Sequence, residues 1–209
     1  MSAKLLKADV LFFQRILMVS GYYAGPLDGK WSKAVDDGEK RFDDEYERIK
    51  EKQGAFDPRT ETAIRTLIPS AQKKARAFMS AAADQSVTCK LISGTRTYAE
   101  QDALYAIGRT VQLNKRKVTN AKGGGSNHNF GIAWDVGIFV GGKYIEGNNA
   151  KEEKLYTDLG AAILKKVKGL EWGGSWSSFV DNPHYQLPTG KTAKEVRKLF
   201  EKGQVYVTG

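Results

Sequence analysis

SNHNFGIAWDVGI, residues 126–138, is the stretch that decides the fold of this chain. In this stretch large apolar residues alternate with small or polar ones, which is the two-residue period of a half-buried strand: Phe130, Ile132, Trp134, Val136 and Ile138. On that strand Asp135 points away from the apolar layer that contains Trp134, and its neighbours on the same face are small. His128 has the wrong parity for the Asp135 face if the strand is straight. Gly131 is therefore the position where we expect the backbone to bend and bring His128 round.

The chain has only two histidines, and each stands near an aspartate. His184 follows Asp181 by three residues, and Pro183 restricts the backbone between them, so a turn there would aim both side chains at one point. Imidazole and carboxylate are usual ligands of zinc, and a catalytic zinc takes three protein ligands and leaves a position for water. Two histidines and two aspartates are the residues that a zinc hydrolase needs for three metal ligands and a general base. The alternative for a single histidine is a buried, hydrogen-bonded core residue.

The amino-acid composition excludes chemistry that needs several cysteines. The 209 residues, 23.1 kDa in mass, contain a single cysteine, which excludes an intrachain disulfide and a multi-cysteine zinc site. That residue, Cys89, lies in a predicted strand over 87–93, and we expect it to be a small buried hydrophobe.

The formal net charge of +9 predicts an anionic partner: nucleic acid, anionic lipid or bacterial cell wall. The basic clusters are short, at 115–117 and 165–168, and no nucleic-acid-binding signature accompanies them. We therefore expect a cell-wall partner, peptidoglycan, with no nucleic acid. No apolar run reaches the roughly 20 residues needed to span a bilayer. Residues 1–9 lack the pattern of a signal peptide. We expect a monomer made in the cytoplasm, not inserted in a membrane, that reaches the wall by another route.

Residues 1–68 are expected to be helical. Apolar residues recur at helical spacing at Leu6, Val10, Phe13, Ile16 and Leu17. A turn cluster at 25–29 and a charged helix over 36–52 follow. A last helix over 60–67 is predicted, with Asp57 as N-cap and Pro58 at its first position.

In residues 69–209 the spacing of apolar residues is helical in some segments and typical of strands in others. The predicted helices are 71–83, 97–108, 156–167 and 193–202, and the predicted strands are 87–93, 130–138, 143–145, 170–172 and 183–187. A hairpin turn at Gly141-Gly142 and a Gly-rich loop over 111–126 complete the pattern. We therefore predict an α+β fold, with a small antiparallel sheet, flanking helices and a zinc site in a domain over 69–209. A small all-α module over 1–68 precedes it.

The N-terminal part resembles the peptidoglycan-binding module found at the ends of wall hydrolases. The resemblance rests on Phe13–Leu17, Gly21–Trp31 and Asp57–Ile64. A charged insertion separates the second and third of these segments, whereas in the family one follows the other almost directly. The alternative is a helical cap that packs on the enzyme.

The histidine segments carry a second resemblance. Ser-x-His-x₆-Asp at 126–135, followed by Asp-x-x-His at 181–184, resembles the zinc D-Ala-D-Ala metallopeptidase superfamily. The Asp-x-Pro-His-Tyr form over 181–185 is closer to its L-alanyl-D-glutamate endopeptidases, found in phage endolysins and wall-recycling enzymes. Residues 171–176 and 93–101 match two further family segments.

This resemblance implies specific roles. The implied zinc ligands are His128, Asp135 and His184, the general base is Asp181, and the substrate-facing arginine is Arg96. Trp172 is a candidate substrate-binding residue, and together with Trp176 we expect it to form cleft wall and core rather than to take part in the chemistry. Arg96 would stabilise the carbonyl oxygen as negative charge develops; a structural ion pair is its alternative. Ser126 would either hold substrate or orient the His128 loop.

The implied activity is zinc-dependent cleavage of peptidoglycan stem peptides between L-Ala and D-Glu, by a phage endolysin or a secreted antibacterial effector. The alternatives are a D-Ala-D-Ala carboxypeptidase or dipeptidase of the same superfamily, and a non-catalytic zinc-stabilised wall-binding protein.

Overall fold

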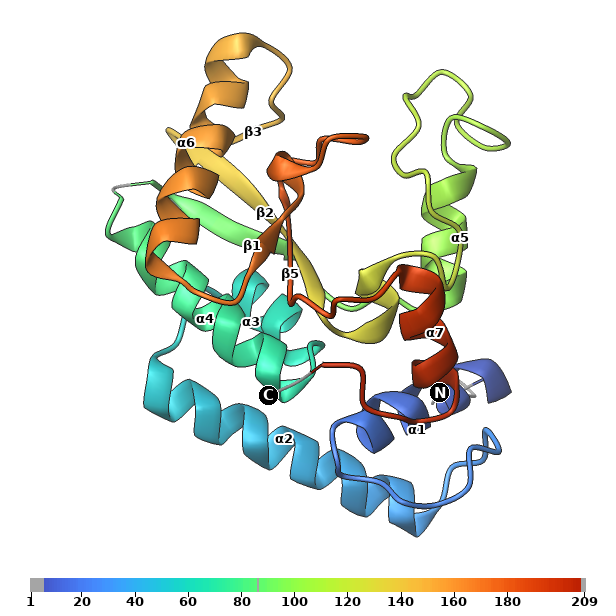
Figure 1. Cartoon of the computed structure of the whole chain (residues 1–209). Coiled ribbons are helices and arrows are strands. Elements are labelled where there is room, and N and C mark those ends of the chain that lie inside the picture. The colour runs from blue at the N-terminus through green and yellow to red at the C-terminus, as the bar shows by residue number, and fades with distance from the viewer. Residues whose placement is uncertain (1–5, 86, 208–209) are drawn as a thin grey trace. The chain divides into compact units, whose positions relative to one another are not determined.

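The structure, a computed structural model, describes residues 6–85 and 87–207 (Figure 1). The predicted lack of a signal peptide rests partly on residues 1–5, which lie outside the described part. The helices are α1 (Lys7–Val19), α2 (Lys33–Gln53), α3 (Pro58–Arg65), α4 (Pro69–Ala83), α5 (Tyr98–Ala106), α6 (Ala150–Lys166) and α7 (Ala193–Glu201), with short 3₁₀ helices η1 (Asn127–Phe130) and η2 (Gly173–Ser175). The strands are β1 (Cys89–Ser93), β2 (Ala133–Val140), β3 (Lys143–Ile145), β4 (Glu171–Trp172) and β5 (His184–Gln186).

The chain divides into two compact units. The helical unit comprises Met1–Glu45, Arg96–Gly131 and Thr189–Gly209. The sheet unit comprises Tyr46–Thr95 and Ile132–Pro188. Helix α3, which precedes residue 68, belongs to the sheet unit, whereas residues 96–131 and 189–209, which follow it, belong to the helical unit. The domain boundary between residues 68 and 69 stays a prediction. A wall-binding role for residues 1–68 stays a prediction.

The sheet unit is built on five antiparallel strands in the order β1-β2-β5-β4, with β3 paired to β2. The apolar side chains of Trp134 and Val136 are buried, as the alternating pattern predicts, and Leu91 and Tyr185 on the neighbouring strands are buried as well. Helices α3 and α4 pack on β1, and α6 contacts α4 and β4 (Figure 1). The predicted α+β class with a small antiparallel sheet is confirmed.

Helix α3 is tied to the sheet by specific hydrogen bonds. Asp57 caps its N-terminus by accepting from the backbone N–H groups of Arg59 and Thr60, as predicted. The Thr60 hydroxyl accepts from the backbone N–H of Leu91 in β1 at 3.2 Å. Polar groups of α3 therefore complete the hydrogen bonding of the sheet that they cover.

A buried ion pair joins α3 to α4. The Arg76 side chain is fully buried, and its two terminal nitrogens donate to the two carboxylate oxygens of Glu61 at 2.8 and 2.7 Å. Tyr46 from α2 also donates to Glu61, at 2.5 Å, and the carbonyl of Gly54 accepts from Arg76 at 2.8 Å. Burial alone would raise the pKa of Glu61, but the hydrogen bonds from Arg76 and Tyr46 lower it below its ordinary value. The carboxylate is thus held ionised.

The helical unit has an aromatic core. Phe12 of α1 contacts Tyr98 and Phe200 edge-on, and Phe130 contacts Phe200 and Tyr206. The hydroxyl of Tyr206 donates to the backbone carbonyl of Phe130. Residues from three separate segments therefore meet in one cluster.

Several predicted boundaries differ from the observed ones. Leu6, expected on the apolar face of the first helix, precedes α1 and is 68% exposed. Helix α6 begins at Ala150 rather than 156, because Asn149 accepts from the backbone N–H of Glu152 and caps it. Among the described residues, no helix has both the length and the apolar character needed to cross a bilayer.

Candidate metal centre

Asp135 and His184 face each other on neighbouring strands. Asp135 of β2 is the register partner of His184 at the start of β5, so both side chains leave the same face of the sheet. The His184 Nδ1 atom lies 3.4 Å from the Asp135 Oδ1 atom. The other ring nitrogen, Nε2, lies 3.0 Å from the Gln186 Oε1 atom. Both His184 nitrogens thus have defined polar neighbours.

A tight turn presents Asp181 beside His184. The backbone N–H of His184 donates to the carbonyl of Asp181 at 3.1 Å, and the carbonyl of Pro183 accepts from Val136 at 3.0 Å. The Asp181 backbone N–H in turn donates to the carbonyl of Gly173 at 3.0 Å. A Cβ on Gly173 would lie 2.5 Å from the Asp181 carbonyl, so only glycine allows this approach. The turn expected at Pro183 is present.

The charge environment acts on His184. Burial alone lowers the pKa of this imidazole, because the charged form loses its hydration. The hydrogen bond and charge of Asp135 oppose burial, as do Gln186 and the charge of Asp181, and the net effect raises the pKa above 6.5. In the absence of a metal, this ring holds a proton more tightly than an ordinary histidine.

His128 lies in the short helix η1, whose N-cap is Ser126. The Ser126 hydroxyl accepts from the His128 backbone N–H at 3.4 Å. Gly131 ends η1 with φ = 70°, a left-handed conformation that suits glycine, and β2 starts two residues later. The bend expected at Gly131 is therefore present. The backbone carbonyl of His128 also accepts from the backbone N–H of Arg96 at 3.1 Å.

His128, Asp135 and His184 each offer one ligand atom, and these three atoms lie within 4.8 Å of one another. Asp181 is not a member of this cluster. Two imidazoles and one carboxylate with a further carboxylate nearby form a donor set suited to a metal ion that activates water. Fold and site together define a candidate metallohydrolase.

The other predicted site residues have different surroundings. Arg96 donates through Nη1 to Gln101 at 2.9 Å. Trp172 is buried, stacks on Tyr185 and donates to the carbonyl of Asn182 at 2.8 Å. A substrate contact through Trp172 stays a prediction.

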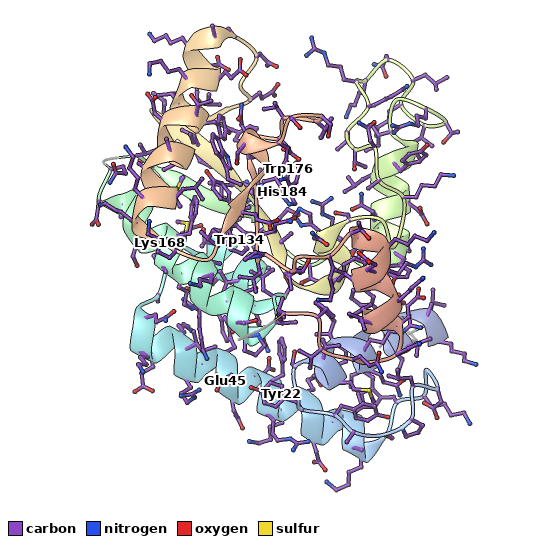
Figure 2. The ribbon with its side chains drawn as sticks, viewed as in Figure 1. Tyr22, Glu45, Trp134, Lys168, Trp176 and His184 are labelled. Atoms are coloured by element: carbon purple, nitrogen blue, oxygen red, sulfur yellow. The ribbon has the colours of Figure 1, made fainter. Side chains whose placement is uncertain are left out.

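The indole ring of Trp176 lies beside the imidazole of His184, with their ring centres 5.0 Å apart (Figure 2). The sequence reasoning gave no role to Gln186 or Glu171. The amide of Gln186 donates to the Glu171 carboxylate at 2.6 Å. The two are register partners, and strand pairing between such short strands leaves little signal in the sequence.

Known proteins resemble this chain. A family model described as D-alanyl-D-alanine carboxypeptidase matches residues 119–187. The peptidoglycan L-alanyl-D-glutamate endopeptidase CwlK of Bacillus subtilis (strain 168) is 36% identical over 128 residues, which are 58% of this chain and 73% of that protein. The L-alanyl-D-glutamate peptidase of Listeria phage A118 is 33% identical over 88 residues, 39% of this chain and 29% of that protein. The crystal structure of Serratia marcescens L-Ala D-Glu endopeptidase ChiX aligns with a TM-score of 0.47 at 23% identity, covering 65% of this chain and 90% of that one.

The match to the Bacillus enzyme spans nearly three quarters of that protein. The chain belongs to the M15 peptidase family, whose matching model carries the D-alanyl-D-alanine carboxypeptidase description. The family matched is the one that the histidine motifs predicted.

Proposed function

We propose that this chain is a zinc-dependent peptidoglycan endopeptidase that cuts the stem peptide between L-Ala and D-Glu. The observation that carries the proposal is the convergence of His128, Asp135 and His184, with Asp181 beside them, in an M15 peptidase similar to CwlK. We further propose that it acts at the wall as a monomer, after release from the cytoplasm, as an endolysin or a secreted effector. Residues 1–68 would help hold it there.

The donor set fits zinc. Two ligand atoms bound to a tetrahedral zinc at about 2.0–2.1 Å stand about 3.3 Å apart. The separation of His184 Nδ1 and Asp135 Oδ1 is 3.4 Å. His128, Asp135 and His184 would hold the ion, which when bound polarises the scissile carbonyl and acidifies the attacking water.

The protein side chains would then move the proton and stabilise charge. Asp181 would accept a proton from the attacking water and deliver it to the leaving amine nitrogen as the peptide bond breaks. Backbone hydrogen bonds with Gly173 and His184 fix the position of its main chain beside His184. Arg96 would stabilise negative charge on the carbonyl oxygen. Ser126, as the cap of η1, would orient the His128 loop.

Digestion of purified peptidoglycan tests both the metal and the bond. We expect new amino-terminal D-Glu by mass spectrometry, abolished by a chelator and restored by zinc. The family description favours a second candidate, a D-alanyl-D-alanine carboxypeptidase. Release of free D-Ala without new D-Glu termini would support that candidate and contradict ours. Wall binding with zinc but no cleavage would indicate a non-catalytic protein.

Zinc stabilisation is expected to depend on pH. In the metal-free chain the pKa of His184 is raised above 6.5, so its pairing with Asp135 stabilises the fold fully below about pH 6.5 and is lost as pH rises through the folded pKa. Zinc must displace this proton. The increase in Tm on adding zinc should therefore grow between about pH 6 and pH 8. Melting curves with zinc and with chelator measure it, and an increase that shrinks as pH rises would contradict the assignment.

A further inference from the structure

A row of polar side chains crosses one face of the sheet from β2 to β4. Asp135 faces His184, His184 bonds to Gln186, and Gln186 bonds to Glu171. His184 and Gln186 are two residues apart on β5 and share a face, while Glu171 is the register partner of Gln186. His184 and Gln186 are each less than 8% exposed. The row thus links the candidate metal centre to a carboxylate two strands away.

The chemistry of Glu171 fixes the direction of every hydrogen bond in the row. An ionised carboxylate only accepts hydrogen bonds, so Gln186 turns its amide nitrogen toward Glu171. The amide oxygen of Gln186 then faces His184 Nε2, 3.0 Å away, and this oxygen only accepts. The Nε2 atom of His184 must therefore carry the hydrogen.

A neutral imidazole has one N–H, so a hydrogen on Nε2 leaves the lone pair on Nδ1. Nδ1 is the atom that faces Asp135 in the metal centre. We propose that Gln186 and Glu171 are positioning residues, which hold His184 in the tautomer whose Nδ1 binds the metal. With Gln186 turned the other way, its amide nitrogen would donate to Nε2 and the hydrogen would move to Nδ1, where it would block the metal. Glu171 excludes that arrangement because it cannot donate.

Zinc affinity of the full-length chain is the first test, measured by competition with a chromophoric chelator. Gln186→Met keeps the length of the side chain but removes the acceptor, and we expect zinc to bind about 10- to 100-fold more weakly. The matched control is Gln72→Met. Gln72 is a fully buried glutamine on α4 in the same unit, and it donates to the carbonyl of Leu67 at 2.8 Å. We expect Gln72→Met to leave zinc affinity unchanged.

Glu171→Gln is a gentler variant for the case in which Gln186→Met does not fold. Glutamine at 171 can donate as well as accept, so Gln186 can turn over, and we expect a loss near the lower end of the same range, about 10-fold. NMR of ¹⁵N-histidine-labelled, zinc-loaded protein supplies a second measurement, simple because the chain has only two histidines. We expect His184 to show a slowly exchanging Nε2–H that weakens in Glu171→Gln.

The outcomes separate this inference from the proposed function on which it rests. A wild-type chain that binds no zinc overturns the metal centre itself. A wild-type chain that binds zinc while Gln186→Met binds it equally well overturns only the positioning role, as does a His184 hydrogen found on Nδ1. Weaker zinc binding in Gln186→Met but not in Gln72→Met supports it.

Discussion

Asp181→Asn is expected to lower kcat/KM for stem-peptide cleavage by about two to four orders of magnitude, the usual contribution of general acid–base catalysis. Asparagine keeps the size of the side chain but cannot take the proton from water. Asp181 lies outside the ligand cluster, so bound zinc should be retained, as measured by metal analysis of the same preparation.

Two comparisons make this result specific. Asp135→Ala and His128→Ala should each lose both zinc and activity, because each removes a proposed ligand. Asp158→Asn removes a carboxylate from α6 that is 62% exposed and should change neither. If Asp181→Asn released the zinc, Asp181 would be a ligand, and the proposed separation of base from ligands would be wrong.

Glu61→Ala is expected to lower the free energy of unfolding by about 3–5 kcal/mol, the usual result of removing one partner of a buried ion pair. The variant leaves the guanidinium of Arg76 fully buried, with the Gly54 carbonyl still accepting from it but no compensating charge at 61. Urea unfolding at a fixed zinc concentration measures the change. The control is Glu47→Ala, whose ion pair with Lys50 is exposed and is expected to contribute less than about 1 kcal/mol. Equal losses of unfolding free energy in the two variants would contradict a larger contribution from the buried Glu61–Arg76 pair.

The same carboxylate should contribute to acid sensitivity. Because the pKa of Glu61 is lowered on folding, its contribution is present above the unfolded value near 4.5 and is lost as pH falls through the folded value. Glu61→Ala should therefore show a shallower loss of stability below about pH 4.5.

A chain that starts at Pro69 also lacks Glu61. Wall binding by residues 1–68 is thus better tested by point variants of the full chain than by cutting at that position.

Local patterns in the sequence predicted most elements of the fold. Alternation over 130–138 predicted β2, although Phe130 belongs to η1 and the strand begins at Ala133. Asp57-Pro58 predicted the start of α3. These signals act within a few residues, so periodicity and cap chemistry are sufficient to detect them. The turn at Pro183 was predictable for the same reason.

Features that depend on strand register or on distant packing were not predictable. The bond between Gln186 and Glu171 requires β4 and β5 to pair in one register, and Arg76 resembles any other helical cation until its partner is known. The sequence alone assigns no specific role to Gly173. In the structure Gly173 lets the backbone of Asp181 approach closely. Its role depends on a contact eight residues along the chain, which no local pattern records.

The aromatic cluster of the helical unit bears on how the protein is made in a cell. Phe200 is translated roughly 10–40 s after its partner Phe12 at ordinary elongation rates. Until then the apolar side of α1 has no Phe200 to cover it, and such surface favours aggregation. We expect soluble yield to rise with slower synthesis or added chaperone. A nascent chain that stalls before Phe200 should remain sensitive to protease around α1.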